Sequence, residues 1–423
     1  MPVDFSFPPE LVDLRLRVRE FMETVVRANE AAGDEAGWGR SDWVRAIVDM
    51  RAAAKEAGLW LPHMPKEWGG MGLSHVAMAA VSAEAARTRM GPMALNAQAP
   101  DEGNMHTLLH WGTEEQKEKY LKPLCEGVRL VDGKPKGFRS CFAMTEPDVA
   151  GSDPTLIQTR AYRDGDEWVI NGHKWFISGA RGAQFAILIA RTEDNPDVPQ
   201  SANSAFLVDI PSDGWEVVRD VETMSGSHNH CEIRITDLRV HRDRMLGSPG
   251  SGHLLGQYRL GPARLAHCMR WIGQAETALD MMVDRALGRY SHGSVLAEKQ
   301  GIQWLIADST IELYQAKLMV LHCAYLIDAG GNDASIVDFT GEVSMTKYFV
   351  SNTLNRVIDR AVQVHGALGY STDTPLAGML TQARWARFAD GADEIHLMRT
   401  AGRAIAAYKD DGSTRRATGN LPL

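Results

Sequence analysis

The sequence predicts a mainly α-helical protein with a central antiparallel β domain. Helix caps and helical spacing run to about residue 130, apolar residues alternate with a period of two over 139–246, and helical spacing returns from about residue 261. We expect an N-terminal helical domain at 1–138, a central β domain at 139–255, a C-terminal helical bundle at 256–410 and a polar tail at 411–423. A chain of 423 residues is long enough for two or three such domains.

Helix signals mark the first third of the chain. Ser41 is expected to cap a helix that runs through Ile47 and ends near Gly58. Thr113 and Gln116 form the pattern of a capping box, and Pro123 is expected to end that element, because proline interrupts helical hydrogen bonding.

The middle third carries turn and strand signals. Asp164-Gly165 and Asn171-Gly172 are typical hairpin turns, and they are expected to flank a short strand around Trp168. Further strands are expected at 185–190, 205–210, 215–218 and 231–235. This pattern favours an antiparallel meander. It excludes a nicotinamide-binding Rossmann domain, since no GxGxxG follows a strand.

The last third contains two apolar stripes with helical spacing. Each steps by three and four residues, which is typical of core positions in a helical bundle. The stripes are formed by Leu265, Cys268, Ile272, Ala275, Leu279 and Met282, and by Ile302, Ile306, Ser309, Leu313, Ala316 and Val320.

Composition and charge narrow the class of protein. Hydrophobic residues make up 44% and charged residues 23%, as in ordinary soluble proteins, and the net charge of −9 argues against nucleic-acid binding. The five cysteines are widely spaced without a CxxC, so a reducing compartment fits best. No membrane-spanning apolar run is present, and the first residues lack a signal-peptide pattern. We therefore expect a cytoplasmic protein.

Two histidine pairs are candidate metal ligands. His106 and His110 are four residues apart, and His228 and His230 form an HxH. No carboxylate follows either pair at metalloprotease spacing, so no metal site is expected.

Three polar, glycine-bearing segments are candidates for chemistry. Residues 141–153 suit a polar ligand edge or phosphate, or alternatively form an interdomain turn. Residues 363–370 have the pattern of a helix C-terminus. In 389–396, Asp390 and Gly391 precede the last expected helix. The spacing is equally consistent with Asp390 as a helix N-cap and with Asp390 as a catalytic carboxylate. Asp393 and Glu394 fall in that helix's first turn, where acidic residues are favourable.

Six motifs in order resemble the acyl-CoA dehydrogenase family, and they cover essentially the whole chain. They are EWGGMG (67–72), AMTEPDVAGSD (143–153), INGHKWFIS (170–178), GRYSHGSVLAEKQ (288–300), QVHGALGY (363–370) and RFADGADEIH (387–396). The resemblance implies the acyl-CoA dehydrogenase fold, with an N-terminal helical domain, an antiparallel β domain and a C-terminal four-helix bundle. It also implies bound FAD and a homo-oligomer, either a dimer or a tetramer.

The resemblance implies roles for individual residues that match the family's motifs. The cofactor-contacting positions are matched by Phe142, Met144, Thr145, Gly151, Ser152, Phe176, Ile177, Ser178, Arg289, Gln300, Gln363, Gly366, Ala392 and Glu394. The substrate-contacting positions are matched by Ser152, Arg264 and Gly391. Arg289 falls where the family binds the partner subunit's FAD, and a guanidinium suits diphosphate oxygens.

The family's catalytic base is usually a Glu before a Gly, and this position is Asp390 here. Some subfamilies place the base one residue before the matched arginine, but that position is Ala263. The resemblance thus implies that Asp390 removes an α-proton of an acyl-CoA while the β-hydride passes to flavin N5, giving a trans-2-enoyl-CoA. Electrons would leave to an electron-transferring flavoprotein, as in fatty acid β-oxidation.

Several residues depart from the usual family pattern. Asp is shorter than Glu by one C–C bond, roughly 1.5 Å. The loop TEPDVAGSD is one residue longer than usual, Ala392 replaces a hydroxyl residue and His292 replaces an aromatic residue. DGADEIH and GPARLAHCMR most resemble the branch whose vertebrate members carry a kinase-like domain, and this resemblance raises a separate kinase as a candidate partner.

Two other functions remain open on the sequence. The first is a flavin oxidase or monooxygenase of the same fold, since nitroalkane oxidases also use an Asp at this position. The second is a non-catalytic or nucleic-acid-associated relative, against which the charge of −9 argues.

Overall fold

The computed structural model describes residues 6–37, 39–132, 134–193, 198–226, 229–330 and 339–418. The chain divides into two compact units. The helical unit comprises Met1–Gly37, Leu73–Pro92 and Arg264–Leu423, and the sheet unit comprises Trp38–Gly72 and Met93–Ala263. No helix in the part of the chain that the structure describes is long and apolar enough to cross a membrane.

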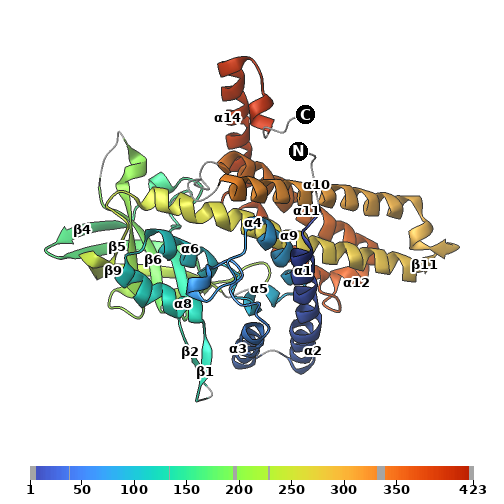
Figure 1. Cartoon of the computed structure of the whole chain (residues 1–423), viewed down its shortest axis with the longest axis horizontal. Helices are drawn as coiled ribbons and strands as arrows, with labels where there is room; N and C mark the ends of the chain where they lie inside the picture. Colours follow the sequence, from blue (N-terminus) through green and yellow to red (C-terminus); the bar gives the residue numbers. More distant parts are fainter. Residues whose placement is uncertain are drawn as a thin grey trace. The chain divides into compact units, whose positions relative to one another are not determined.

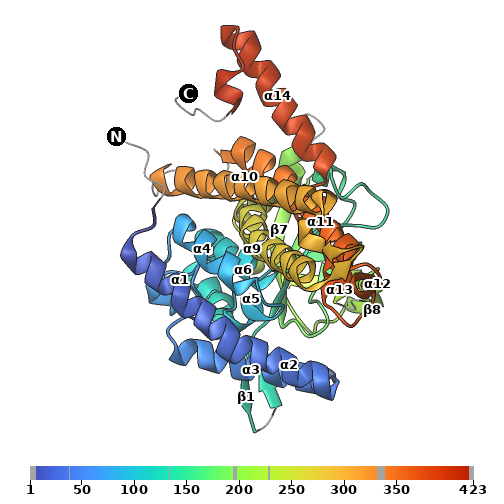
Figure 2. The same ribbon diagram turned by 90° about the vertical axis from the view of Figure 1, so that its right-hand side faces the viewer.

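The helical unit is built on three long helices that lie side by side, α9, α10 and α11 (Figures 1 and 2). In both views α14 projects from them. The helices of this unit are α1 (Pro9–Phe21), the π-helix η1 (Met22–Val26), α2 (Arg27–Ala36), α4 (His75–Ala85), α9 (Gly252–Gly288, in this unit from Arg264), α10 (Gln300–Gly330), α11 (Thr340–His365), α12 (Ala367–Tyr370), α13 (Leu376–Ala383), η9 (Arg384–Arg387), α14 (Asp393–Asp411) and η10 (Arg415–Thr418). A short hairpin of β11 (Tyr290–Ser291) and β12 (Ser294–Val295), followed by η7 (Leu296–Glu298), connects α9 to α10.

The two predicted apolar stripes form the core of this bundle. Leu265, Cys268, Ile272 and Ala275 of α9 are buried against Leu313, Ala316 and Val320 of α10, together with apolar residues of α11. The prediction of bundle helices is therefore confirmed, and the helices hold together by burying these faces.

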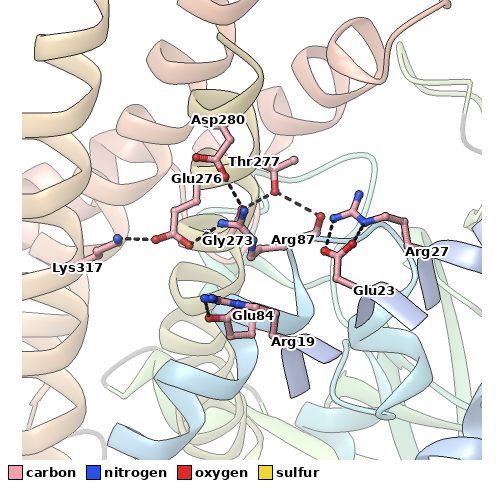
Figure 3. A network of polar contacts seen from close by, with 10 residues as sticks. All are labelled: Arg19, Glu23, Arg27, Glu84, Arg87, Gly273, Glu276, Thr277, Asp280 and Lys317. Atoms are coloured by element: carbon pink, nitrogen blue, oxygen red, sulfur yellow. Dashed lines mark hydrogen bonds and ion pairs between the residues drawn. The ribbon is translucent and has the colours of Figure 1, made fainter. Parts of the chain in front are cut away.

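Ion pairs attach the N-terminal helices to the bundle in the same unit (Figure 3). Arg19 of α1 donates two hydrogen bonds to the buried carboxylate of Glu84 in α4, at 2.6 and 3.1 Å. Arg87, which follows α4, contacts Glu276 and Asp280 of α9. Lys317 of α10 binds the other oxygen of Glu276. Ion pairs between these carboxylates and the neighbouring cations thus link α1, α4, α9 and α10.

The sheet unit consists of an eight-stranded sheet, a separate two-stranded hairpin and several helices. Its helices are α3 (Arg40–Glu56), η2 (Lys66–Trp68), α6 (Asp101–Trp111), α7 (Glu114–Gln116), the π-helix η3 (Lys117–Leu121), α8 (Lys122–Glu126), η4 (Pro154–Leu156), η5 (Pro199–Ala202) and η6 (Arg242–Arg244), while α5 (Gly91–Ala94) crosses the division between the units. Its strands are β1 (Arg129–Val131), β2 (Lys134–Lys136), β3 (Ser140–Ala143), β4 (Arg160–Asp164), β5 (Glu167–Ser178), β6 (Phe185–Arg191), β7 (Asn203–Asp209), β8 (Trp215–Val221), β9 (His230–His241) and β10 (Met245–Leu246). Strands β1 and β2 form a separate hairpin (Figure 1).

The order of the main sheet is β10-β7-β6-β4-β5-β9-β8, with β3 paired to β6. The strands predicted at 185–190, 205–210, 215–218 and 231–235 are present as β6, β7, β8 and β9, and the Asp164-Gly165 hairpin between β4 and β5 is confirmed. The prediction of an antiparallel meander was wrong in part. Strands β3 and β4 each pair with β6 in parallel, and neighbouring strands of the sheet are not always consecutive in the chain.

Asn171-Gly172 was predicted to be a turn, and this prediction was wrong. Both residues lie inside the long strand β5, beside an irregularity in its pairing with β9. The side chain of Asn171 bridges across the sheet to Asp237, with hydrogen bonds of 2.9 and 3.0 Å. A Cβ atom at Gly172 would lie 2.2 Å from Thr159 Oγ1, so the glycine allows a close approach of two segments.

Two helix boundaries also differ from expectation. The Thr113–Gln116 capping box is present. However, α3 begins at Arg40 after Gly39, so Ser41 does not cap it. Pro123 does not end its helix. The π-helix η3 runs directly into α8, and the helix continues through Pro123 to Glu126.

A buried ion pair joins β5 to the segment after β3. Lys174 is fully buried, and its Nζ donates to Glu146 Oε1 at 2.8 Å and to the Met144 carbonyl at 2.9 Å. Burial lowers the pKa of Lys174 to about 8, and Glu146 counteracts this. The Glu146 carboxylate also accepts hydrogen bonds from Thr159 and from the main chain at Gln158.

We expect Glu146→Ala to lower the free energy of unfolding by about 3–5 kcal/mol, since it leaves a buried cation without its counter-charge. Urea denaturation followed by intrinsic fluorescence measures this loss. The matched control is Glu167→Ala in the same sheet, whose partner Arg239 is 53% exposed and which should cost at most about 1 kcal/mol. Equal losses in the two variants would contradict the role assigned to the buried pair.

Candidate active site

Asp390 lies in the turn between η9 and α14 and has a left-handed main-chain conformation. Its φ is 55° and that of Gly391 is 114°. The N-cap of α14 is Ala392, so the N-cap interpretation of Asp390 is wrong, while Asp393 and Glu394 do occupy the first turn of the helix. A non-glycine residue in this region is strained and persists where its surroundings hold it there.

Two buried cations bind the carbonyl groups of this turn. Arg264 of α9 donates from Nε to the Asp390 carbonyl at 2.6 Å, and Lys347 of α11 donates from Nζ to the Gly391 carbonyl at 2.6 Å. Burial lowers the pKa of Arg264 to about 10 and also lowers the pKa of Lys347. These charge-assisted hydrogen bonds hold the strained turn and place the Asp390 side chain.

The first turn of α14 is anchored beneath Asp390. The buried carboxylate of Asp393 accepts hydrogen bonds from Arg387 at 2.7 Å and from Asn352 at 3.0 Å. A Cβ atom at Gly391 would lie 2.8 Å from Nε2 of buried His396, so glycine is required there on steric grounds as well. Burial lowers the pKa of His396 to about 3, and this ring therefore stays neutral.

The Asp390 carboxylate is 23% exposed and faces a histidine. Nε2 of His267 lies 3.3 Å from Asp390 Oδ2. Neither His267 nor Lys347 is among the site residues predicted from the sequence. A signal for His267 existed, because Arg264, His267 and Arg270 recur every three residues and so share one face of α9.

In the sheet unit, the structure brings two of the predicted cofactor-contacting segments together. The main-chain N–H of Trp175 donates to the Thr145 carbonyl at 3.1 Å, and the Thr145 hydroxyl donates to the Trp175 carbonyl at 2.7 Å. Met144 and Thr145, which follow β3, therefore lie directly beside the end of β5. Phe142 of β3 is partly exposed and contacts the guanidinium of Arg259 at 4.2 Å from its ring centroid.

The end of β5 presents Phe176 to the surface. Phe176 has a φ of 53° within a pairing irregularity and is 38% exposed. Its ring lies 5.5 Å from that of His230, whose Nδ1 is 2.9 Å from the Ser178 hydroxyl. The side chain of Ile177 points into the sheet core, so a ligand could contact only its main chain.

The aromatic and hydroxyl side chains of Thr145, Phe176 and Ser178 fit the isoalloxazine ring of FAD. An exposed aromatic side chain, Phe176, matches a flat aromatic ring, and the hydroxyls of Thr145 and Ser178 match its polar edge. Gly151 and Ser152 lie exposed in the loop that follows. A separate hollow of about 300 Å³ in this unit is lined by Asp148, His173 and Arg234 among others and contains none of the predicted site residues.

The remaining predicted residues lie in the helical unit. Arg289 and Gln300 flank the β11–β12 hairpin, and Gln363 and Gly366 lie where α11 ends, at the same end of the bundle (Figures 1 and 2). All four are exposed. Ala392 and Glu394 lie at the start of α14.

The histidines weighed as metal ligands have other contacts. Nε2 of His106 lies 3.1 Å from Nδ1 of His63, and His110 stacks on Tyr258 with ring centroids 4.2 Å apart. His228 lies outside the described residues. Within those residues, no group of three or more His, Cys, Asp or Glu side chains is placed to hold a metal ion.

Comparison with known proteins identifies relatives along almost the whole chain. Models of the acyl-CoA dehydrogenase N-terminal, middle and C-terminal domains match residues 8–128, 141–238 and 250–405. The probable acyl-CoA dehydrogenase FadE2 of Mycobacterium tuberculosis is 39% identical over 414 residues, which cover 96% of this chain and 98% of that protein.

A vertebrate relative and a solved structure agree with this result. Acyl-CoA dehydrogenase family member 11 of Homo sapiens is 36% identical over 93% of this chain, but the chain spans only 48% of that longer protein. A Mycobacterium abscessus structure assigned to the acyl-CoA dehydrogenases is 36% identical with a TM-score of 0.86, covering 96% of this chain and all of that one. The chain therefore belongs to the acyl-CoA dehydrogenase family, whose members are FAD-dependent oxidoreductases that act on CH–CH groups.

Proposed function

We propose that the protein catalyses α,β-dehydrogenation of an acyl-CoA thioester to a trans-2-enoyl-CoA, with Asp390 as the base that removes the α-proton. The observation that carries this proposal is the Asp390–Gly391 turn. Two buried cations hold its carbonyl groups at 2.6 Å, while the carboxylate stays partly exposed. A carboxylate held in this way is oriented for proton transfer at low entropic cost.

FAD, when bound, accepts the hydride from the β-carbon. In the sheet unit, we propose that Phe176 packs against the ring system, and that Thr145, Ser178 and the main chain around Met144 contact its polar edge. Gly151 and Ser152 would contact the thioester arm, with Arg264 and Gly391 shaping the substrate side near Asp390. The buried pair of Lys174 and Glu146 holds the Met144 segment in place for this task.

We further propose that the protein is a homo-oligomer, in which Arg289, Gln300, Gln363 and Gly366 bind FAD of a partner subunit. Exposed apolar side chains on the helical unit support self-association, among them Trp304, Tyr314 and Tyr325 of α10 and Met398 and Tyr408 of α14, each at least 60% exposed. The three-domain division with boundaries near residues 138 and 255, a cytoplasmic location and a role in fatty acid β-oxidation belong to the same proposal. An electron-transferring flavoprotein is its proposed electron acceptor.

Anaerobic titration with a panel of acyl-CoAs, followed by flavin absorbance, tests the function. Short, long, branched and 4-hydroxylated chains are compared. Bleaching by one class supports dehydrogenation and identifies the substrate. If no thioester bleaches the flavin of a protein that retains FAD, the dehydrogenase proposal fails, and the oxidase or monooxygenase alternative is then tested with nitroalkanes and oxygen.

We expect Asp390→Asn to retain FAD and to lower the rate of flavin reduction by about a hundredfold to ten-thousandfold, because the amide cannot accept the α-proton. Stopped-flow absorbance measures the rate, and thermal unfolding checks the fold. Asp390→Glu should recover part of the activity. Turnover of Asp390→Asn near the wild-type rate would show that another group is the base.

We expect Arg289→Ala to weaken FAD retention by about tenfold or more, since it removes charge-assisted hydrogen bonds to the diphosphate. Flavin absorbance after dialysis and sedimentation velocity measure cofactor content and oligomer size. The control is Arg239→Ala, an arginine of the sheet unit that is 53% exposed. FAD content and oligomer size equal to those of the control would rule out the interface role.

A further inference from the structure

His267 contacts the Asp390 carboxylate directly, although the proposed reaction does not require a histidine. It lies one turn after Arg264 on α9, so the two side chains reach the same turn from one helix face. Arg264 binds the main chain of Asp390, whereas Nε2 of His267 approaches Oδ2 at 3.3 Å. The His267 side chain is 12% exposed, which limits competition from water.

The second ring nitrogen of His267 shows where its proton lies. Nη2 of Arg270 is 3.2 Å from Nδ1 of His267. A guanidinium can only donate hydrogen bonds, so Nδ1 must accept, and the proton of the neutral ring lies on Nε2. Nε2–H therefore faces the Asp390 carboxylate, with Nε2 3.3 Å from Oδ2.

Two tryptophans hold the plane of the ring. Trp271 is nearly parallel to His267, at an interplanar angle of 16° and a centroid distance of 5.5 Å. Trp385 meets the ring edge-on at 78° and 5.2 Å, and the two tryptophans contact each other at 5.7 Å. The ring can therefore move little, and the donor direction is set by packing.

We propose that His267 is a positioning residue for the base: its Nε2–H binds Oδ2 of Asp390, keeps that carboxylate ionised and leaves Oδ1 to take the α-proton. The inference rests on the proposed role of Asp390. It extends that role by assigning different tasks to the two carboxylate oxygens. Arg270 takes part indirectly, because it selects the tautomer that donates.

Other charged groups face this turn from each neighbouring element. Arg264 of α9 and Lys347 of α11 bind its carbonyls, and Arg399 of α14 adds positive charge near Arg264. Asp393 opposes them with its negative charge but is paired with Arg387 of η9. None of these groups is changed when His267 is replaced. A shift of the pH profile in a His267 variant therefore reports the loss of the Nε2–H group beside the Asp390 carboxylate.

The first test compares His267→Phe with His267→Gln in the FAD-loaded protein. Phenylalanine keeps a flat ring against Trp271 without a donor, and the glutamine amide restores a donor. We expect the acid limb of the pH profile of flavin reduction to move up by about one pH unit in His267→Phe, because the carboxylate loses a hydrogen bond that favours its charged form. His267→Gln should stay near the wild-type profile.

The matched control is His110→Phe, which also replaces a histidine that stacks on an aromatic residue, although His110 itself is exposed. Its profile should equal that of the wild type. A structural role for His267 would lower the melting temperature or FAD content without moving the acid limb. Superimposable profiles for His267→Phe and wild type, with Asp390→Asn inactive, would overturn the inference and leave the proposed function intact.

The second test does not depend on turnover. In protein labelled with ¹⁵N-histidine, with His267 assigned from His267→Gln, we expect a neutral ring with its proton on Nε2 between about pH 8 and about pH 9, above the ordinary titration range of histidine. Its Nε2 resonance should shift in Asp390→Ala. A proton on Nδ1, a charged ring over this range, or no response to Asp390→Ala would overturn the inference, even if no acyl-CoA reduced the flavin.

Discussion

The candidate site depends on two buried cations that bind main-chain oxygens. Arg264 and Lys347 come from different helices and bind the carbonyls of Asp390 and Gly391. A left-handed aspartate costs on the order of 1–3 kcal/mol, and this strain persists only where surrounding contacts determine it. The hydrogen bonds from the two buried cations keep the main chain of Asp390 in this conformation, and the core of the bundle keeps both cations in place. The direction of the Asp390 side chain is a consequence of how α9 and α11 pack.

In the sheet unit, too, a buried cation binds a main-chain carbonyl near proposed site residues. Lys174 is buried and binds the Met144 carbonyl, next to the residues proposed to contact the flavin edge. Its counter-charge, Glu146, also binds the segment at Gln158 and Thr159. In both units a buried cation therefore shapes the main chain near proposed site residues, while hydroxyl, aromatic and carboxylate side chains stay accessible. Main-chain positions held this way cost no reorganisation when a ligand arrives.

The proposed base, Asp390, has a shorter reach than a glutamate would have, so its orientation matters more. The structure surrounds Asp390 with a donor on its carboxylate, cations on its turn and an aromatic wall formed by Trp271 and Trp385. These groups lie on α9, α11 and η9, and they are brought together only by folding. The arrangement places positive charge and aromatic side chains around one partly exposed carboxylate, which favours an orientation suited to the proposed proton abstraction.

The sequence alone determined the class of fold, the positions of most strands and bundle helices, and the motifs that identify the family. It could do so because periodicity, caps and hairpin turns are local properties, and because six motifs in order are specific together. Local signals failed where distant residues competed. Asn171 lies within a strand because it bonds to Asp237, and Gly172 is there because Thr159 approaches closely.

Only the tertiary structure decided what surrounds Asp390. Arg264 lies 126 positions before Asp390, and Lys347 lies 44 positions before Gly391, so no local pattern connects them. The tautomer of His267 likewise follows from Arg270 on one side and Asp390 on the other. Burial of the apolar stripes of α9, α10 and α11 brings these helices together, and that packing gives each buried polar group its partner.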